Sequence, residues 1–163
     1  MWASFCRWIQ HTSVGTAIGQ STWAFPAIET VHLLGMILLV GSIATFDLRL
    51  LSLLMRRQSV SQLAGRLLPC AWVGFGVMVV TGTLLFASDA IRKYGPNPVF
   101  PIKMLLILLA GVNVLIFHST VYRGVTKWDD APVTPLGARL AGCCSLLLWT
   151  GVVTAGRWIG FIP

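Results

Sequence analysis

The stretch Ala27–Met55, AIETVHLLGMILLVGSIATFDLRLLSLLM, decides the fold class of this chain. Its centre is long and apolar enough to cross the ~30 Å hydrocarbon core of a bilayer as a helix. Glu29 and His32 lie near its start, and Asp47 and Arg49 lie near its end. Because ionisable groups are costly in hydrocarbon, a helix that keeps them is expected to face the interior of a bundle.

Three further apolar runs follow, and the composition agrees with a membrane protein. The predicted spans cover residues 25–46, 67–87, 99–117 and 140–158. Of the 163 residues, 56% are hydrophobic and 10% are charged, whereas about a quarter of a soluble protein is charged. No alternation typical of barrel strands is present. The sequence therefore predicts one all-α domain over residues 1–163, a transmembrane four-helix bundle in a lipid bilayer.

The N-terminal segment has a different character from the four spans. Trp2, Phe5 and Ile9 share one helical face, and the segment is too short and polar to cross a membrane. An interfacial amphipathic helix is expected here. No signal peptide is expected, because these residues lack a continuous apolar core and a typical cleavage site. The net charge of +7 indicates orientation and lipid contact, with no nucleic-acid partner.

The basic residues predict the orientation in a bacterial cytoplasmic membrane. Seven of the twelve lie on the side of the first and third loops: Arg49, Arg56, Arg57, Arg66, Arg123, Lys127 and Arg139. Cytoplasmic loops carry the excess of Lys and Arg. Both termini are therefore predicted on the periplasmic side.

Placing the polar residues by depth gives two layers. The outer layer contains Glu29, His32, Lys103 and Arg157, and the inner layer contains Asp47, Arg49 and His118. Along the first span, fifteen residues or about 22 Å of helix separate His32 from Asp47. Lys103 and His118 have the same separation along the third span.

One interpretation of these layers is structural. Glu29 could pair with Lys103 or Arg157, and Asp47 with Arg49 or His118, as ion pairs that join helices. His32 lies about two turns inside an apolar span, where a neutral imidazole is a natural haem or metal ligand. A hydrogen bond from this histidine to a neighbouring helix is the competing interpretation.

Several motifs carry a resemblance. The segments WAFPAIETVHLLG, FDLRLL, TGTLLF, NPVFPIKMLLILLAGVN, FHSTVYR and LLLWTGVVTAGRWI resemble a family of small bacterial membrane proteins of unknown function. The order of a His and an Arg in the first span, a T-G in the second and a Lys opening the third is also distantly similar to HemJ-type protoporphyrinogen oxidases and CopD-type copper-resistance proteins. The HemJ resemblance implies a haem b role for His32 and an activity role for Lys103, with Arg49 matching the Arg. The W-x-x-G and L-P-R-L contexts of the HemJ type are absent.

The first functional hypothesis is a membrane protein that binds haem b and transfers electrons. His32 would be one axial ligand, and Lys103 and Arg157 would pair with the haem propionates. His118 lies at a different depth, so it is a ligand of a second site or a structural residue. His11 is another candidate for the second ligand if the N-terminal helix folds over the outer face.

Three alternatives stay open. The chain could be an accessory or scaffold subunit of a larger membrane complex, or a homo-oligomer, without its own cofactor. It could handle copper through His32, Met36 and Met104, although Cys6, Cys70, Cys143 and Cys144 form no C-x-x-C motif. A HemJ-like enzyme is the third alternative, and no soluble-type catalytic signature is present.

Overall fold

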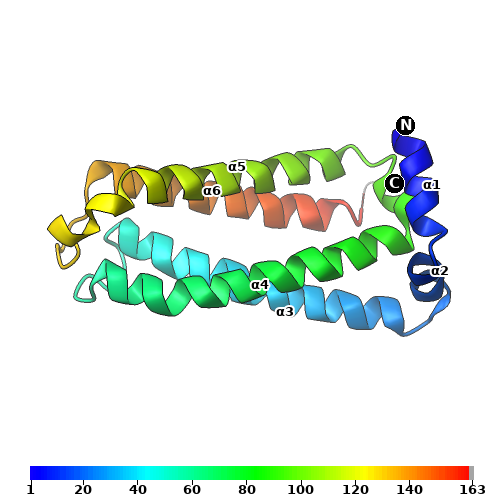
Figure 1. Ribbon diagram of the computed structural model, residues 1–163, viewed down its shortest axis with the longest axis horizontal. Helices are drawn as coiled ribbons and strands as arrows, with labels where there is room; N and C mark the ends of the chain where they lie inside the picture. Colours follow the sequence, from blue (N-terminus) through cyan, green and yellow to red (C-terminus); the bar gives the residue numbers. More distant parts are fainter. Residues whose placement is uncertain (162–163) are drawn as a thin grey trace.

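Helices make up the regular structure of this protein. The computed structural model describes residues 1–161, and no strand occurs among them. Four long helices run along a common axis: α3 (Ala24–Leu50), α4 (Val60–Ser88), α5 (Val99–Ser119) and α6 (Leu136–Trp158) (Figure 1). Each is long and apolar enough to cross a membrane. The prediction of an all-α four-helix membrane bundle is confirmed.

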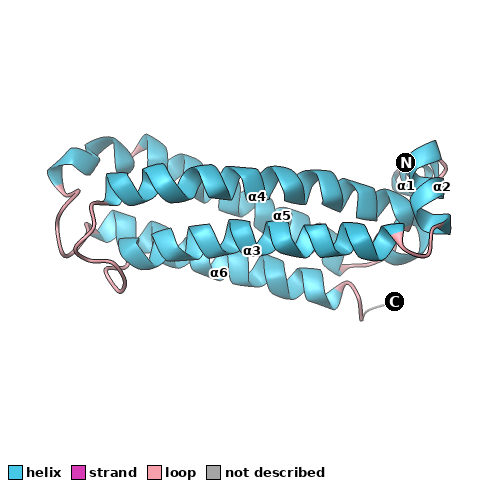
Figure 2. Ribbon diagram, turned by 90° about the horizontal axis from the view of Figure 1, so that it is seen from below, coloured by secondary structure: helices cyan, strands magenta, loops and turns pink. Residues whose placement is uncertain are grey.

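The two ends of the bundle differ in what covers them (Figures 1 and 2). One end, named the terminal end here, carries α1 (Trp2–Gln10), α2 (Ser13–Gln20) and η1 (Ala90–Tyr94). The opposite end, named the loop end, carries the α3–α4 connection and η2 (Tyr122–Lys127). Successive long helices therefore run in alternating directions between these two ends.

The N-terminal helix is present, but it is divided in two. The Thr12 hydroxyl accepts a hydrogen bond from the Gly15 amide at 3.2 Å and caps the start of α2. Helix α1 crosses the terminal end of the bundle at a steep angle to the long helices (Figure 1). Its Cys6 is buried in a cluster with Phe86 and Ala90. An orientation across the bundle axis is the one that an interfacial helix needs.

Two helices begin earlier than the apolar pattern predicts. Helix α4 starts at Val60, not near residue 67, and α6 starts at Leu136, not near residue 140. The Ser59 hydroxyl caps α4 by accepting a hydrogen bond from the Gln62 amide at 3.4 Å. Hydropathy marks only the part of a helix that lies in hydrocarbon, so polar first turns escape it.

The bundle consists of two close helix pairs, α3 with α4 and α5 with α6, joined through α3 and α6. Glycines allow the closest approach. A Cβ atom on Gly74 would lie 2.7 Å from the Leu39 amide nitrogen, and one on Gly35 would lie 2.7 Å from Val77 Cγ1. Small residues at such positions let transmembrane helices pack backbone to backbone.

Apolar side chains cover the outside of the bundle. On α5 the large exposed ones are Ile102, Met104, Leu105, Leu108, Leu109, Val112, Leu115 and Ile116. A continuous apolar face of this extent is stable in lipid and unfavourable in water. The protein is therefore a multi-pass membrane protein in a lipid bilayer.

Candidate functional site

His32 makes a hydrogen bond to the neighbouring helix α4, as the competing interpretation of this residue predicts. Its Nδ1 lies 2.7 Å from Thr81 Oγ1, and that hydroxyl donates to the Val77 carbonyl at 2.6 Å. The Thr81 hydroxyl has one hydrogen, which it donates to the Val77 carbonyl. In its contact with His32 the hydroxyl oxygen is therefore the acceptor, and His32 Nδ1–H is the donor. The hydrogen-bond network thus assigns the proton of the neutral imidazole to Nδ1 and leaves a lone pair on Nε2.

Gly82 forms the surface against which the imidazole packs. A Cβ atom at this position would lie 3.3 Å from His32 Cε1. The ring therefore lies close against the α4 backbone, and any larger residue would push it outwards. Thr81 and Gly82 together fix both the rotation and the position of the His32 ring.

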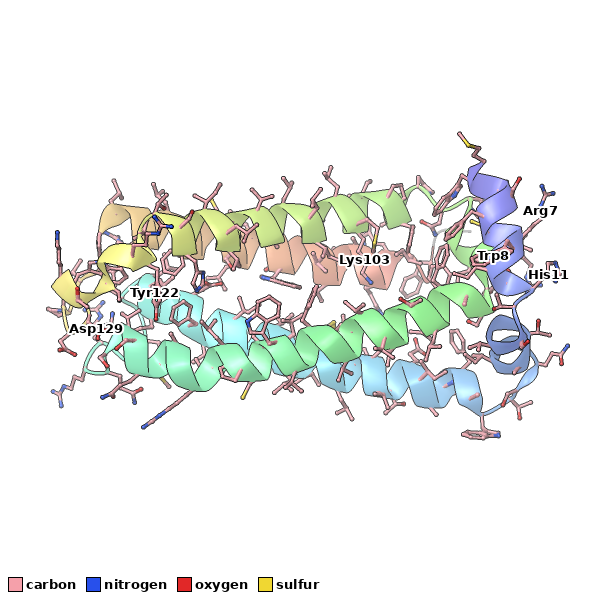
Figure 3. The ribbon with its side chains drawn as sticks, in the orientation of Figure 1. Arg7, Trp8, His11, Lys103, Tyr122 and Asp129 are labelled. Carbon is pink, nitrogen blue, oxygen red and sulfur yellow. The ribbon has the colours of Figure 1, made fainter. Side chains whose placement is uncertain are left out.

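Lys103 adds a cation from the second helix pair. It is half-buried on α5 and points into the bundle (Figure 3). A Cβ atom on Gly156 of α6 would lie 3.4 Å from its Nζ. The ammonium is close enough to His32 to interact with it electrostatically. All four long helices thus contribute to one site in the terminal half of the bundle, which consists of His32, Thr81, Gly82, Lys103 and Gly156.

The other two histidines do not join this site. His118 lies at the loop end of α5, where its Nδ1 is 3.0 Å from the Val114 carbonyl of its own helix. Its ring contacts Phe117 and Tyr122 at centroid distances of 5.3 and 5.0 Å. His11 is exposed after α1 and points away from the bundle (Figure 3). The structure therefore brings neither histidine to His32.

Arg157 and Glu29 also lie outside this site. Arg157 is exposed near the end of α6, and its guanidinium lies 5.1 Å from the Phe161 ring centroid. Glu29 is exposed on α3. Burial raises the pKa of Tyr94 to about 12, and the charges of Asp89 and Glu29 add to that rise. Tyr94 therefore stays a neutral phenol at physiological pH.

Arg49 binds backbone carbonyls of two loops and not the nearby Asp47 carboxylate. It is 0% exposed and donates to the backbone carbonyls of Gln58, Asp129 and Ala131 at 2.9, 3.4 and 3.1 Å. Residues two apart on a helix point in different directions, so the guanidinium does not face the Asp47 carboxylate. Arg49 instead joins the α3–α4 loop to the segment before α6.

The predicted ion pairs do not form within residues 1–161. There, the ion pair that does form joins Arg92 to Asp89 at 3.5 Å, near the surface of the terminal end. Glu29, Asp47 and Arg49 have no opposite charge within ion-pairing distance in the described part of the chain. The polar residues of the spans are held by hydroxyls and backbone carbonyls instead.

Asp129 completes the loop end, and sequence reasoning did not single it out. Its carboxylate accepts from the Ser61 amide at 2.7 Å and the Ser61 hydroxyl at 2.5 Å. Partial burial acts to raise the pKa of Asp129, but hydrogen bonds from Ser61 and Val60 and the Arg49 charge outweigh burial and hold the pKa below its ordinary value. The carboxylate also lies at the positive N-terminal end of α4.

A second contact closes the same end. The Thr134 amide donates to Ser52 Oγ at 3.1 Å, and the Thr134 hydroxyl donates to the Leu50 carbonyl. Ser52 and Thr134 are 5% and 3% exposed. We name the set Arg49, Ser52, Ser61, Asp129 and Thr134 the loop clasp. Sequence analysis singled out Arg49 of this set but not its partners, because the other four are ordinary polar residues of the loops and helix ends.

The side chains of residues 1–161 form no cluster of metal ligands. No group of three or more His, Cys, Asp or Glu side chains in that range is placed to hold a metal ion. Cys143 and Cys144 are exposed on α6, and Cys6 is buried in the α1 cluster. Among the described residues, what the site in the terminal half offers is the oriented His32 imidazole and the Lys103 cation.

The family of unknown function DUF6644 matches residues 3–162 of the chain. The chain belongs to this family. The match covers the long helices and the N-terminal helices together, so the DUF6644 region coincides with the whole bundle. No curated protein and no solved structure matches this DUF6644 chain. Its function must therefore be argued from its own residues.

Proposed function

We propose that this protein binds haem b in the terminal half of the bundle through His32 Nε2, and that it transfers electrons within the membrane. The observation that carries the proposal is the chain from His32 Nδ1 to Thr81 Oγ1 to the Val77 carbonyl. Histidines that ligate a metal donate their other N–H to an oxygen, which fixes the ring and increases its basicity. The same geometry prepares Nε2 as a ligand.

Two features of the surrounding residues support the proposal. Lys103 supplies a cation beside the imidazole that can pair with a carboxylate of the macrocycle. Gly82 and Gly156 leave the His32 and Lys103 side chains in contact with bare backbone, with no Cβ atom in the way. Bound haem supplies one-electron chemistry, and the protein supplies ligation, charge and exclusion of water.

The proposal is for a single histidine ligand. His11 is exposed outside the bundle, and His118 lies at the loop end against Val114. We therefore expect a site with His32 as its only imidazole. This distinguishes the proposal from a bis-histidine cytochrome, whose two imidazoles would need to lie at the same depth.

The experiment is a visible spectrum of the purified protein from haem-replete cells, as isolated and after dithionite. A Soret band is expected in the wild type and is expected to be lost in His32→Ala. His118→Ala and His11→Ala are the matched controls, and both should keep the band. A colourless wild type, or an unchanged band in His32→Ala, would overturn the proposal. A colourless protein with a partner at fixed ratio would favour the accessory-subunit alternative.

We also propose that the loop end faces the cytoplasm in a bacterial inner membrane. The support is the set of basic residues at that end, among them the exposed Arg56, Arg57, Arg66 and Arg139. A reporter enzyme that is active only in the periplasm should be inactive when fused after Arg57 and active when fused after Pro96. The reverse pattern would overturn this orientation.

A further inference from the structure

Asp47 is a buried carboxyl that the terminal-half site does not use. It lies one turn before the end of α3 and is 4% exposed. The Ser145 hydroxyl on α6 lies near its carboxyl, and its Oδ2 is buried with no hydrogen-bond partner among residues 1–161. A Cβ atom on Gly142 would lie 3.1 Å from the Asp47 carbonyl oxygen, so α3 and α6 are in close contact here.

Among residues 1–161, no basic side chain forms an ion pair with Asp47. On the four long helices, the basic side chains of this half are Arg49, Arg66, His118 and Arg139, and its thiols are Cys70, Cys143 and Cys144. Arg49 donates to loop carbonyls, and His118 bonds Val114. Arg66 on α4 and Arg139 on α6 are exposed. In residues 1–161 no cation lies within ion-pairing distance of the Asp47 carboxyl.

The remaining neighbours of this part of α3 are apolar. Phe46 and Leu50, on either side of Asp47, pack in a cluster with Val60 and Leu63 of α4 and Phe117 of α5. An unpaired carboxylate in such surroundings is costly, whereas a neutral carboxylic acid can be held by a single hydroxyl. The surroundings of Asp47 therefore suit the neutral form of the side chain.

We propose that Asp47 is a proton-binding site in the loop half of the bundle. The carboxyl holds a proton at neutral pH, with Ser145 as its hydrogen-bond partner. The site is about 22 Å along α3 from His32 and does not depend on haem.

Infrared spectroscopy tests the protonation state directly. The chain has five acidic residues, of which four are aspartates. Asp129 is held ionised by Ser61, Asp89 pairs with Arg92, and Asp130 is exposed. Protein labelled with ¹³C at the aspartate carboxyl and placed in lipid should therefore show one isotope-shifted band of a protonated carboxyl at neutral pH. The band should be absent from Asp47→Asn.

Chemical labelling gives an independent readout. An apolar carbodiimide reacts with protonated carboxyls in membranes, and mass spectrometry should find the adduct at Asp47 in the wild type. Labelling should fall at least tenfold when the pH is raised far enough to remove the proton. Asp47→Asn should lose the adduct, and Asp130→Asn should keep it.

Three outcomes would overturn the proposal. These are no isotope-shifted band at neutral pH, no adduct at Asp47, or protection by Na⁺ at constant pH, which would indicate a cation site instead. If Asp47→Asn does not fold, the isotope shift and the pH dependence in the wild type still decide the question.

Discussion

The terminal half and the loop end of this bundle use polar side chains in opposite ways. At the loop end, Arg49 and Asp129 each make several hydrogen bonds and join segments far apart in the sequence. In the terminal half, the His32 imidazole makes one hydrogen bond to the described residues, through Nδ1, and Nε2 has no partner among them. Several hydrogen bonds per side chain join distant segments at the loop end, although the Arg49 Nη1 is buried without a partner among residues 1–161, whereas the single bond of His32 leaves one ring nitrogen for chemistry.

The largest expected effect is a loss of stability when Arg49 is removed from the loop clasp. Arg49→Ala leaves three carbonyls, those of Gln58, Asp129 and Ala131, without this donor. At about 1 kcal/mol for each lost partner, the free energy of unfolding should fall by about 3 kcal/mol. Thermal unfolding in detergent measures this.

The matched control for that variant is Arg66→Ala, because Arg66 is exposed on α4. Its stability should change by less than about 0.5 kcal/mol. If Arg49→Ala and Arg66→Ala lose the same stability, the hydrogen bonds of Arg49 in the loop clasp do not stabilise the fold more than an exposed arginine does.

The next effect concerns the orientation of His32. Thr81→Val keeps the shape of the side chain and removes the hydroxyl that accepts from Nδ1. Haem affinity should fall by about 10- to 100-fold, as for other outer-shell partners of ligating histidines. Haem titration of the apoprotein gives the affinity.

Thr83→Val is the control for the lost hydroxyl. Thr83 is exposed and donates to the carbonyl four residues earlier, as Thr81 does, but it does not touch His32. Its variant should bind haem as the wild type does. A similar loss in both variants would mean that Thr81 acts on α4 and not on the imidazole.

A smaller change in haem binding is expected when Gly82, against which the His32 ring packs, is replaced. Gly82→Ala places a Cβ atom 3.3 Å from His32 Cε1, so the ring must shift by a few tenths of an ångström. The Soret band should shift and haem affinity should fall a few-fold. Gly76→Ala on the same helix meets no atom within 4 Å and should leave the spectrum unchanged.

The smallest effect concerns the acid stability of the loop clasp. The pKa of Asp129 is held below its ordinary value of 3.8, so its contribution is fully present above that value and is lost as pH falls through the folded pKa. Asp129→Asn should therefore show a flatter decline of melting temperature in acid than the wild type.

Asp130→Asn is the control for this pH dependence, because Asp130 is the exposed neighbour of Asp129. It should retain the wild-type decline. If the melting temperature of Asp129→Asn falls in acid as steeply as that of the wild type, the hydrogen bonds from Ser61 do not favour the ionised carboxylate.

The sequence by itself determined the fold class and the number of spans. A run of apolar residues that is long enough to cross a bilayer core forms a helix, because every backbone amide must then find its hydrogen-bond partner within the same segment. The sequence also singled out His32 and Lys103, because ionisable residues are rare within such runs. These inferences rest on local composition and need no knowledge of neighbouring helices.

The tertiary structure decided the partners of these residues. Thr81 meets His32 across forty-nine positions, and Arg49 meets Ala131 across eighty-two. Depth along a helix follows from residue count, but the direction of a side chain towards a given neighbour depends on how the helices rotate and pair. For this reason the pairing of Asp47 with Arg49, which their proximity in sequence favours, gives way to Ser145 and to the loop carbonyls.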